Sequence, residues 1–317
     1  MNNRKENDSL TKKYIGKNEV FADILDYYLF DGNNVIDSNN LIDVSTDQLL
    51  LEPKLTISER DIFKQALIKK DNNDITYLLL GIENQTNNMN AMVLRNLLYD
   101  VSSYVIQAEG IVNSRKDVKI KMGKRIYSFK DFNKKDRLKP VITLVIYFNP
   151  NKWEGFRSLK EMININNEII DKYLFDYKLN IIEPYRMNNN DFKKFKTHIG
   201  LILEAIQKSN DKESFIDFVT NEDKFKSIPI EAAKIINEFS NIDLVYDDED
   251  GEYNMCKAVE EWKKDLLAEG KAEGIAEGET KNLNNNIKTM HKNGATVELI
   301  AQLLGLDALY VKKILQG

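Results

Sequence analysis

Residues 58–104, SERDIFKQALIKKDNNDITYLLLGIENQTNNMNAMVLRNLLYDVSSY, decide the fold that we expect for this chain. Apolar residues alternate loosely from Arg60 to Ile68, a polar turn cluster occupies 71–74, and a short apolar run occupies 75–82. Such a run is typical of a strand buried on both faces and is too short to span a membrane. The stretch therefore predicts a β-hairpin, followed at once by a helix over 89–111.

Polar residues stand at the open end of this hairpin. Glu83 and Gln85 share a face of their strand because they are two residues apart, and normal pairing brings Asp61 beside them. Two carboxylates with an amide oxygen, or with a backbone carbonyl near Asn84, form a hard-oxygen site that suits Mg²⁺ or Mn²⁺. We predict that Asp61 and Glu83 hold the metal and that Gln85 orients a water molecule.

A family resemblance rests on these residues. An aspartate followed, about twenty residues later, by E-x-Q on a strand is similar to the PD-(D/E)XK nuclease core in its E-x-Q variant. The segment GIENQTNNMNAMVLRNLLYD closely resembles the recombination-promoting nuclease / putative transposase family of bacteria, and so do FADILDYYLFDG upstream and KPVITLVIYFNPNKWEGFRSL downstream. The resemblance implies an α/β fold with a restriction-endonuclease-like core. It also implies a DNA endonuclease of low sequence specificity, linked to recombination or mobile elements.

The resemblance implies two further site residues. In such cores an acidic residue of the first helix sometimes completes the site, and Asp23 is preferred here over Glu19 and Asp26. Arg95 matches a position of the family pattern and would contact a phosphate or a site carboxylate. A surface carboxylate and a surface arginine are the alternative interpretations.

The chain departs from the standard motif at Gln85, where lysine is usual. Lysine both orients the attacking water and offsets developing negative charge, whereas glutamine does only the first. Another cation would therefore help, and Lys64 and Lys69 are the candidates.

The charge of the chain is unevenly distributed. The net charge is −5, but eleven lysines and arginines stand against three aspartates between residues 115 and 139. Such a segment binds phosphates without reading sequence. We expect DNA phosphate contacts from Lys121, Lys124 and Arg125, together with Lys64; a solvated loop is the alternative.

Composition indicates an ordinary globular protein, with 42% hydrophobic and 30% charged residues. A single cysteine, Cys256, excludes a disulfide framework and fits a reducing cytosol, so we expect a cytoplasmic protein. No signal peptide and no membrane association are expected. Residues 1–12 are interpreted as a loosely attached arm.

Four segments are expected along the chain. They are a nuclease core at 14–187, an α-helical extension at 188–264, an Ala-Glu-Gly-rich linker or helix at 265–282, and a helix-turn-helix-like tail at 283–317. In the tail, Thr296 or Ala295 begins one helix and Asp307 caps the next. The tail binds DNA or, as we prefer, helps the C-terminal helices form a homodimer or higher homo-oligomer.

Three functions remain open from the sequence. The first is a Mg²⁺-dependent DNA endonuclease. The second is a catalytically weak or inactive protein that binds DNA or assembles while keeping the nuclease fold, and the third is a nuclease that acts on RNA.

Overall fold

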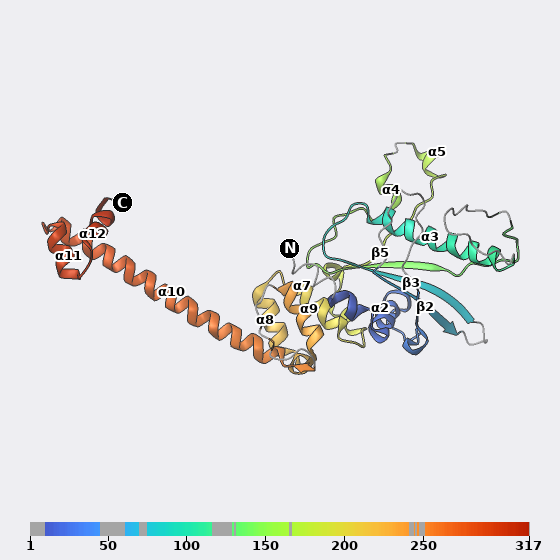
Figure 1. Cartoon of the computed structure of the whole chain (residues 1–317), viewed down its shortest axis with the longest axis horizontal. Helices are drawn as coiled ribbons and strands as arrows, with labels where there is room; N and C mark the ends of the chain where they lie inside the picture. Colours follow the sequence, from blue (N-terminus) through green and yellow to red (C-terminus); the bar gives the residue numbers. More distant parts are fainter. Residues whose placement is uncertain are drawn as a thin grey trace. The chain divides into compact units, whose positions relative to one another are not determined.

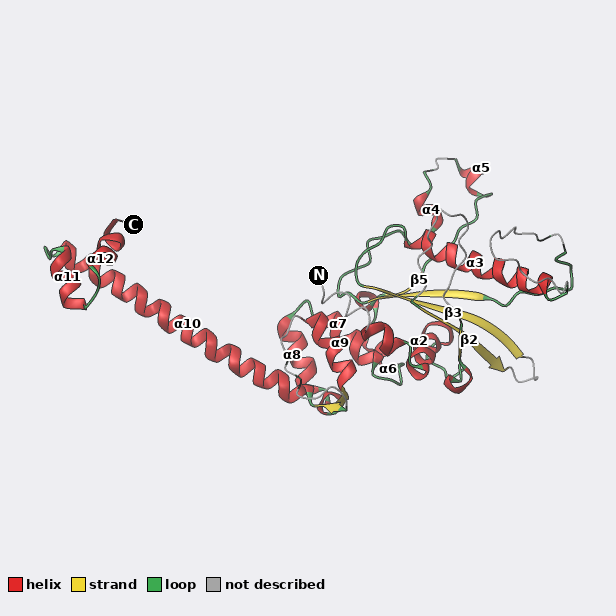
Figure 2. Ribbon diagram, viewed as in Figure 1, coloured by secondary structure: helices red, strands yellow, loops and turns green. Residues whose placement is uncertain are grey.

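The computed structural model describes residues 10–44, 61–69, 75–115, 129, 131–164, 167–240, 244, 246 and 251–316. The chain divides into two compact units, Met1–Cys256 and Lys257–Gly317. Figures 1 and 2 show their helices and strands. Among the described helices, none combines the length and the apolar character that a membrane crossing requires.

The first unit is a mixed α/β structure. Its helices, including 3₁₀ turns η, are α2 Asn18–Phe30, η1 Ser38–Asn40, α3 Met92–Asn113, α4 Leu159–Met162, α5 Glu168–Asp171, η2 Pro184–Arg186, α6 Asn189–Lys193, α7 Ile199–Lys208, α8 Lys212–Asn221, η3 Asp223–Lys226 and α9 Ile230–Ser240. Its strands are β1 Ile42–Asp43, β2 Ile62–Lys69, β3 Ile75–Gln85, β4 Val141–Tyr147, β5 Asn180–Ile182, β6 Ile228–Pro229 and β7 Glu252–Tyr253.

A five-stranded sheet in the order β1-β2-β3-β4-β5 forms the centre of this unit. β1, β2 and β3 pair antiparallel, whereas β4 pairs parallel with both β3 and β5. The predicted hairpin is confirmed as β2 and β3, although its turn at 71–74 lies outside the described residues. Parallel neighbours need a crossover connection, and α3 supplies it between β3 and β4.

Helix α3 covers one face of the sheet (Figure 1). Met92 and Val93 pack against Val145 and Tyr147 of β4, with the buried indole of Trp153 in the same cluster. This cluster fixes the start of α3 near the carboxyl end of β3. Side chains in the first turns of α3 therefore reach the end of the hairpin strand.

Helix α2 covers the opposite face, with α7, α8 and α9 grouped beside it (Figure 1). Phe21, Ile24 and Leu25 of α2 are fully buried, because the apolar residues of this helix recur at helical spacing. The helix ends at Asp31, whose φ of 55° is left-handed and whose backbone N–H donates to the carbonyl of Asp26.

Two segments of this unit differ in part from what the sequence predicted. Residues 1–9 of the expected loose arm lie outside the described residues, but residues 10–15 are helical and Thr11, at 1% exposed, is buried, so this end of the arm is attached to the unit. The expected α-helical extension is helical over most of its described residues, and it also contains a short antiparallel pair, β6 with β7, where no strand was expected. Both deviations arise from tertiary contacts of short segments, whose local sequence pattern is weak.

The second unit consists of helices and loops in its described residues (Figure 2). Its helices are α10 Met255–Lys292, which begins in the first unit, α11 Val297–Leu304 and α12 Ala308–Gln316. α10 runs through the Ala-Glu-Gly repeats, so of the two alternatives for 265–282 the structure has the helix. It also crosses the boundaries expected at 264/265 and 282/283.

The tail has its own small core, in which Ile287 of α10 packs with Ile300, Ala301 and Val311. The Thr296 hydroxyl accepts from the Leu299 N–H and begins α11 as predicted. The Asp307 carboxylate accepts from the Leu309 N–H at the start of α12, also as predicted. Self-association through these helices stays a prediction.

Candidate active site

The hairpin register places Asp61 beside Glu83. Ile62 pairs with Ile82 as the last pair of the antiparallel ladder, so the next residues outward are Asp61 and Glu83. The Asp61 N–H donates to Glu83 Oε1 at 3.2 Å, and the Asn84 N–H donates to Asp61 Oδ2 at 2.9 Å. The hairpin argument predicted that the two carboxylates lie side by side. The structure adds that each has one oxygen held by a backbone N–H across the hairpin.

Glu83 is almost completely buried, and Arg95 compensates its charge. The Glu83 side chain is 1% exposed, and its Oε2 lies 3.0 Å from Arg95 Nη2. A buried carboxylate requires such a partner, because an isolated charge is strongly disfavoured away from water. Of the two contacts expected for Arg95, the structure gives the one to a site carboxylate.

Tyr99 orients Arg95 from one helical turn further along α3. Arg95 Nε donates to the Tyr99 hydroxyl at 2.7 Å, and the guanidinium lies over the Tyr99 ring at 5.5 Å from its centroid. Burial disfavours the charged guanidinium and so lowers the pKa of Arg95. The Glu83 carboxylate and the Tyr99 hydroxyl favour the charged form more strongly, so the net effect is a raised pKa. Arg95 is therefore a fixed positive charge beside Glu83.

Lys12 is a site residue that the sequence interpretation missed. Its Nζ lies 3.7 Å from Asp61 Oδ1, and the two side chains are 48% and 29% exposed. The only local signal was the spacing of Leu10, Tyr14 and Ile15, which is helical but short. No pattern in the sequence indicates that this segment reaches the hairpin.

Gln85 lies at the end of β3, on the same face as Glu83 by strand alternation. Its side-chain Nε2 donates to the backbone carbonyl of Asn87 at 2.7 Å, while the Gln85 backbone carbonyl accepts from the Phe148 N–H at 2.8 Å. The side chain is half-buried, and its amide oxygen is the atom suited to accept a hydrogen bond from water.

The donor set at Asp61 and Glu83 fits Mg²⁺ or Mn²⁺ in a particular way. Mg²⁺ prefers hard oxygens and is usually held by one or two carboxylates, with waters and substrate phosphates completing its shell. Within the described part of the chain, no group of three or more His, Cys, Asp or Glu side chains gathers to hold a metal. The two carboxylates therefore match such a site in the type and number of their donors. Both oxygens of the buried Glu83 already contact the Asp61 N–H and Arg95, so the partly exposed Asp61 is the more accessible ligand.

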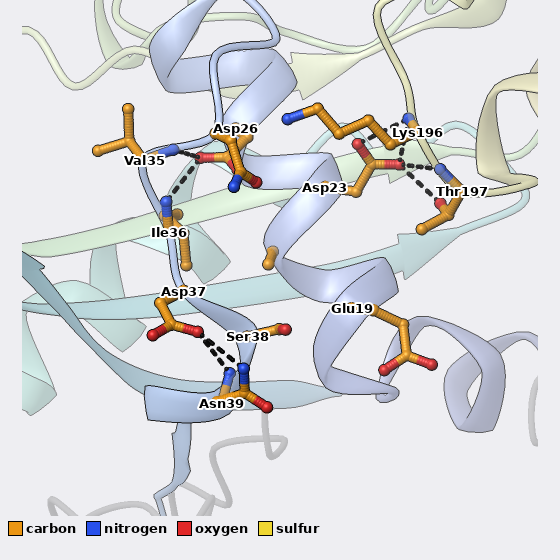
Figure 3. Close-up of a pocket in the computed structure, with 12 residues that line it drawn as sticks. Glu19, Asp23, Asp26, Val35, Ile36, Asp37, Ser38, Asn39, Lys196 and Thr197 are labelled. Carbon is orange, nitrogen blue, oxygen red and sulfur yellow. Dashed lines mark hydrogen bonds between the residues drawn. The ribbon is translucent and has the colours of Figure 1, made fainter.

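Asp23 lies elsewhere. Its carboxylate accepts from the Lys196 N–H at 3.0 Å, from the Thr197 N–H at 2.8 Å and from the Thr197 hydroxyl at 2.7 Å (Figure 3). These bonds anchor the segment between α6 and α7 to α2. Because α2 covers the face of the sheet opposite to Glu83, the structure does not bring Asp23 together with the hairpin carboxylates.

A cavity of about 340 Å³ lies against Asp23. It is also lined by Glu19, Asp26, Asp37 and Lys196. Asp26 Oδ1 accepts from the N–H groups of Val35 and Ile36 (Figure 3), and burial raises the pKa of this carboxyl. The Asp23 and Asp26 carboxylates are thus engaged in holding loops.

Lys64 is also placed away from the site. It is three residues from Asp61 and so points to the opposite face of β2, where its Nζ contacts Asp43 Oδ1 at 2.6 Å and Asn18 Oδ1 at 2.8 Å. At 4% exposed, its side chain is buried, and this position corrects our expectation of a phosphate contact. Lys69 is the last residue of β2, at the other end of the strand from Asp61. Lys121, Lys124 and Arg125 lie outside the described residues.

Comparisons with known proteins do not assign the chain to a family. No protein-family model matches its sequence, and no curated protein or solved structure is significantly similar to it. The site therefore has to be interpreted from its own geometry.

Proposed function

We propose that this protein is a metal-dependent endonuclease that hydrolyses DNA with little sequence preference. The observation that carries the proposal is the pair of carboxylates, Asp61 and Glu83, held side by side at the hairpin end by two backbone hydrogen bonds. Groups fixed before substrate binds lower the cost of organising the transition state. The resemblance of the E-x-Q segment to the PD-(D/E)XK nucleases supplies the reaction class.

We also propose that residues 14–187 form a PD-(D/E)XK restriction-endonuclease-like core. The order of elements supports this: a first helix α2, an antiparallel hairpin β2–β3, a crossing helix α3 and a parallel strand β4. The resemblance implies the same succession over the same segments. Fold alone does not determine activity, so the function rests on the site.

The chain's own residues have distinct roles in the proposed hydrolysis. A water oxygen forms a new bond to phosphorus, one ester P–O bond breaks, the water loses a proton to solvent, and the leaving oxygen gains one. Gln85 orients the water, and Arg95 compensates the charge of Glu83 and holds its side chain in place. Asp61 and Glu83 would hold Mg²⁺ or Mn²⁺, which lowers the pKa of a bound water and offsets charge on the phosphate.

Nicking of supercoiled plasmid tests this function. Wild type, Asp61→Ala and Glu83→Ala would be assayed with Mg²⁺, with Mn²⁺ and with EDTA. We expect cleavage by wild type only when metal is present, and a loss of about a hundredfold or more in each variant. Glu168→Ala is the matched control, because Glu168 is an exposed carboxylate of α5 in the same unit.

Each other outcome selects a different conclusion. Equal cleavage by wild type and by both site variants would indicate a contaminating nuclease and reject the site. Cleavage of RNA but not of DNA would select the ribonuclease alternative. Because Glu83 is buried, circular dichroism must show that Glu83→Ala is folded; otherwise Glu83→Gln replaces it.

A non-catalytic DNA-binding or assembly protein is the second candidate, and one observation favours it. Lys12 and Arg95 lie beside the two carboxylates and supply two positive charges without any metal. Such a compensated cluster also stabilises a hairpin end in a protein with no activity. Salt-dependent DNA binding by folded wild type, without metal-dependent nicking, would select this candidate.

A further inference from the structure

We infer that Lys12 supplies the cation that the motif lacks at Gln85, by placing its ammonium group on the phosphate that is attacked. The inference rests on the proposed nuclease function and names a residue outside the segments that resemble the family. Gln85 cannot offset the negative charge that develops on a phosphate, because its amide is neutral. A cation from another part of the chain has to do so.

The geometry at Asp61 points to Lys12. Asp61 Oδ2 accepts from the Asn84 N–H at 2.9 Å, and Oδ1 is the oxygen of this partly exposed carboxylate that lies toward Lys12. Lys12 Nζ lies 3.7 Å from this oxygen, which is longer than a normal hydrogen bond. The ammonium is therefore close enough for electrostatic attraction to the carboxylate, but it makes no hydrogen bond to this oxygen that would hold it there. Half of the lysine side chain is open to solvent, from which a phosphate would approach.

The backbone of Lys12 is well anchored even though its side chain is exposed. Residues 10–15 are helical, and Thr11, Tyr14 and Ile15 around it are buried at 1%, 4% and 0% exposed. The Gly16 N–H closes the turn on the Lys12 carbonyl at 2.9 Å. The ammonium thus extends from a fixed point on the first unit.

The other cations near the hairpin are less suited to this role. Lys64 is buried on the opposite face of the sheet against Asp43. Arg95 is oriented by Tyr99 and lies against the buried Glu83, so its charge is already directed at the carboxylate. Within the described residues, Lys12 alone contacts Asp61 through an ammonium group.

The proposed contribution is electrostatic. As the water oxygen bonds to phosphorus and the ester bond weakens, negative charge grows on the non-bridging oxygens. In this role the Lys12 ammonium donates hydrogen bonds to one of these oxygens. It neither accepts nor releases a proton, so the balance of the hydrolysis is unchanged.

Single-turnover cleavage at saturating DNA tests the role of Lys12. We expect Lys12→Gln to slow cleavage by about a hundredfold, as expected for loss of one transition-state donor, and Lys12→Arg to retain about a tenth or more of the rate. Lys13→Gln is the matched control, because Lys13 is the exposed neighbour on the same helical segment. It should cleave within about twofold of wild type.

Binding of Mn²⁺ alone, measured by calorimetry without DNA, separates this role from a structural one. Removing a positive charge near Asp61 Oδ1 lowers the repulsion of a cation, so Lys12→Gln should bind Mn²⁺ roughly threefold more tightly. Slower cleavage with tighter metal binding is the expected signature. Weaker Mn²⁺ binding by Lys12→Gln would mean that Lys12 only holds Asp61 in place, and would overturn the inference.

A lysine restored to the motif position provides the rescue. Gln85→Lys combined with Lys12→Gln should recover about tenfold over Lys12→Gln alone, because a cation is again available beside the water. If the double variant cleaves no faster than Lys12→Gln alone, the inference that Lys12 takes the place of the motif lysine is overturned. If wild type cleaves and Lys12→Gln cleaves equally well, the inference fails while the nuclease function stands. If wild type never cleaves, the proposed function fails and the inference fails with it.

Discussion

Arg95 Nη2 lies 3.0 Å from Glu83 Oε2, and this ion pair joins the first turn of α3 to the end of β3. The carboxylate is buried, whereas the Arg95 side chain is 24% exposed. The pair therefore connects the crossover helix to the strand that carries the site. Its loss would affect both the stability of the unit and the position of Glu83.

Arg95→Met should lower the free energy of unfolding by about 2 kcal/mol, because Glu83 is left buried without its cation. Urea denaturation followed by circular dichroism measures the change. Arg186→Met is the matched control: Arg186 pairs with Glu183, another buried carboxylate, but Glu183 keeps Arg157 as a second partner. Equal destabilisation by the two substitutions would contradict a special dependence of Glu83 on Arg95.

Asp23→Ala should lower the free energy of unfolding by about 2 kcal/mol, since the N–H groups of Lys196 and Thr197 lose their acceptor. Per folded molecule, we expect its nicking rate to stay within about threefold of wild type, because such distant structural changes leave the reacting groups in place. Plasmid nicking and urea denaturation on the same sample provide both values. A large loss of nicking with an unchanged free energy of unfolding would indicate that Asp23 takes part in the active site after all.

Two glycine substitutions in the second unit should have effects of opposite sign. Gly270 lies within α10 with nothing near the position of an added Cβ, so Gly270→Ala should stabilise the helix by about 0.5–1 kcal/mol. Gly305 has a φ of +64° after α11, so Gly305→Ala should destabilise the tail by about 1 kcal/mol. Amide hydrogen exchange in α10 and α11 measures each change. Stabilisation by both would contradict the left-handed turn at Gly305.

His198 should make the first unit less stable as the pH falls. Burial lowers the pKa of His198 from its ordinary value of 6.5, with Lys224 lowering it further and Glu252 opposing. Below pH 6.5 the unfolded chain therefore binds a proton that the folded chain resists, and stability is lost as the pH falls toward the folded pKa. The contribution is at most about 1.4 kcal/mol per pH unit.

Urea denaturation between pH 7.5 and 5.5 tests this dependence. His198→Gln should flatten the loss of stability relative to wild type. His291→Gln is the control for removing a histidine as such, because His291 is exposed on α10. An unchanged pH dependence in His198→Gln would show that other groups cause the slope.

The sequence by itself determined the local elements and one part of the site. Apolar runs and turn residues predicted β2, β3 and β4, because strand and helix periodicities arise from neighbouring residues. Residue spacing across a hairpin also placed Asp61 beside Glu83, since register follows once the strands pair. Thr296 and Asp307 marked two helix starts, because capping is a contact between residues two or three apart.

Only the tertiary structure decided which other residues lie near those carboxylates. Lys12 reaches Asp61 from a segment interpreted as a loose arm, and Lys64 points to the opposite face of the same strand. Asp23, assigned to the site by resemblance, instead anchors the segment at Lys196 and Thr197. These positions depend on how whole helices pack on the two faces of the sheet. Periodicity reports which side of an element is buried, and it carries no information about which distant segment covers it.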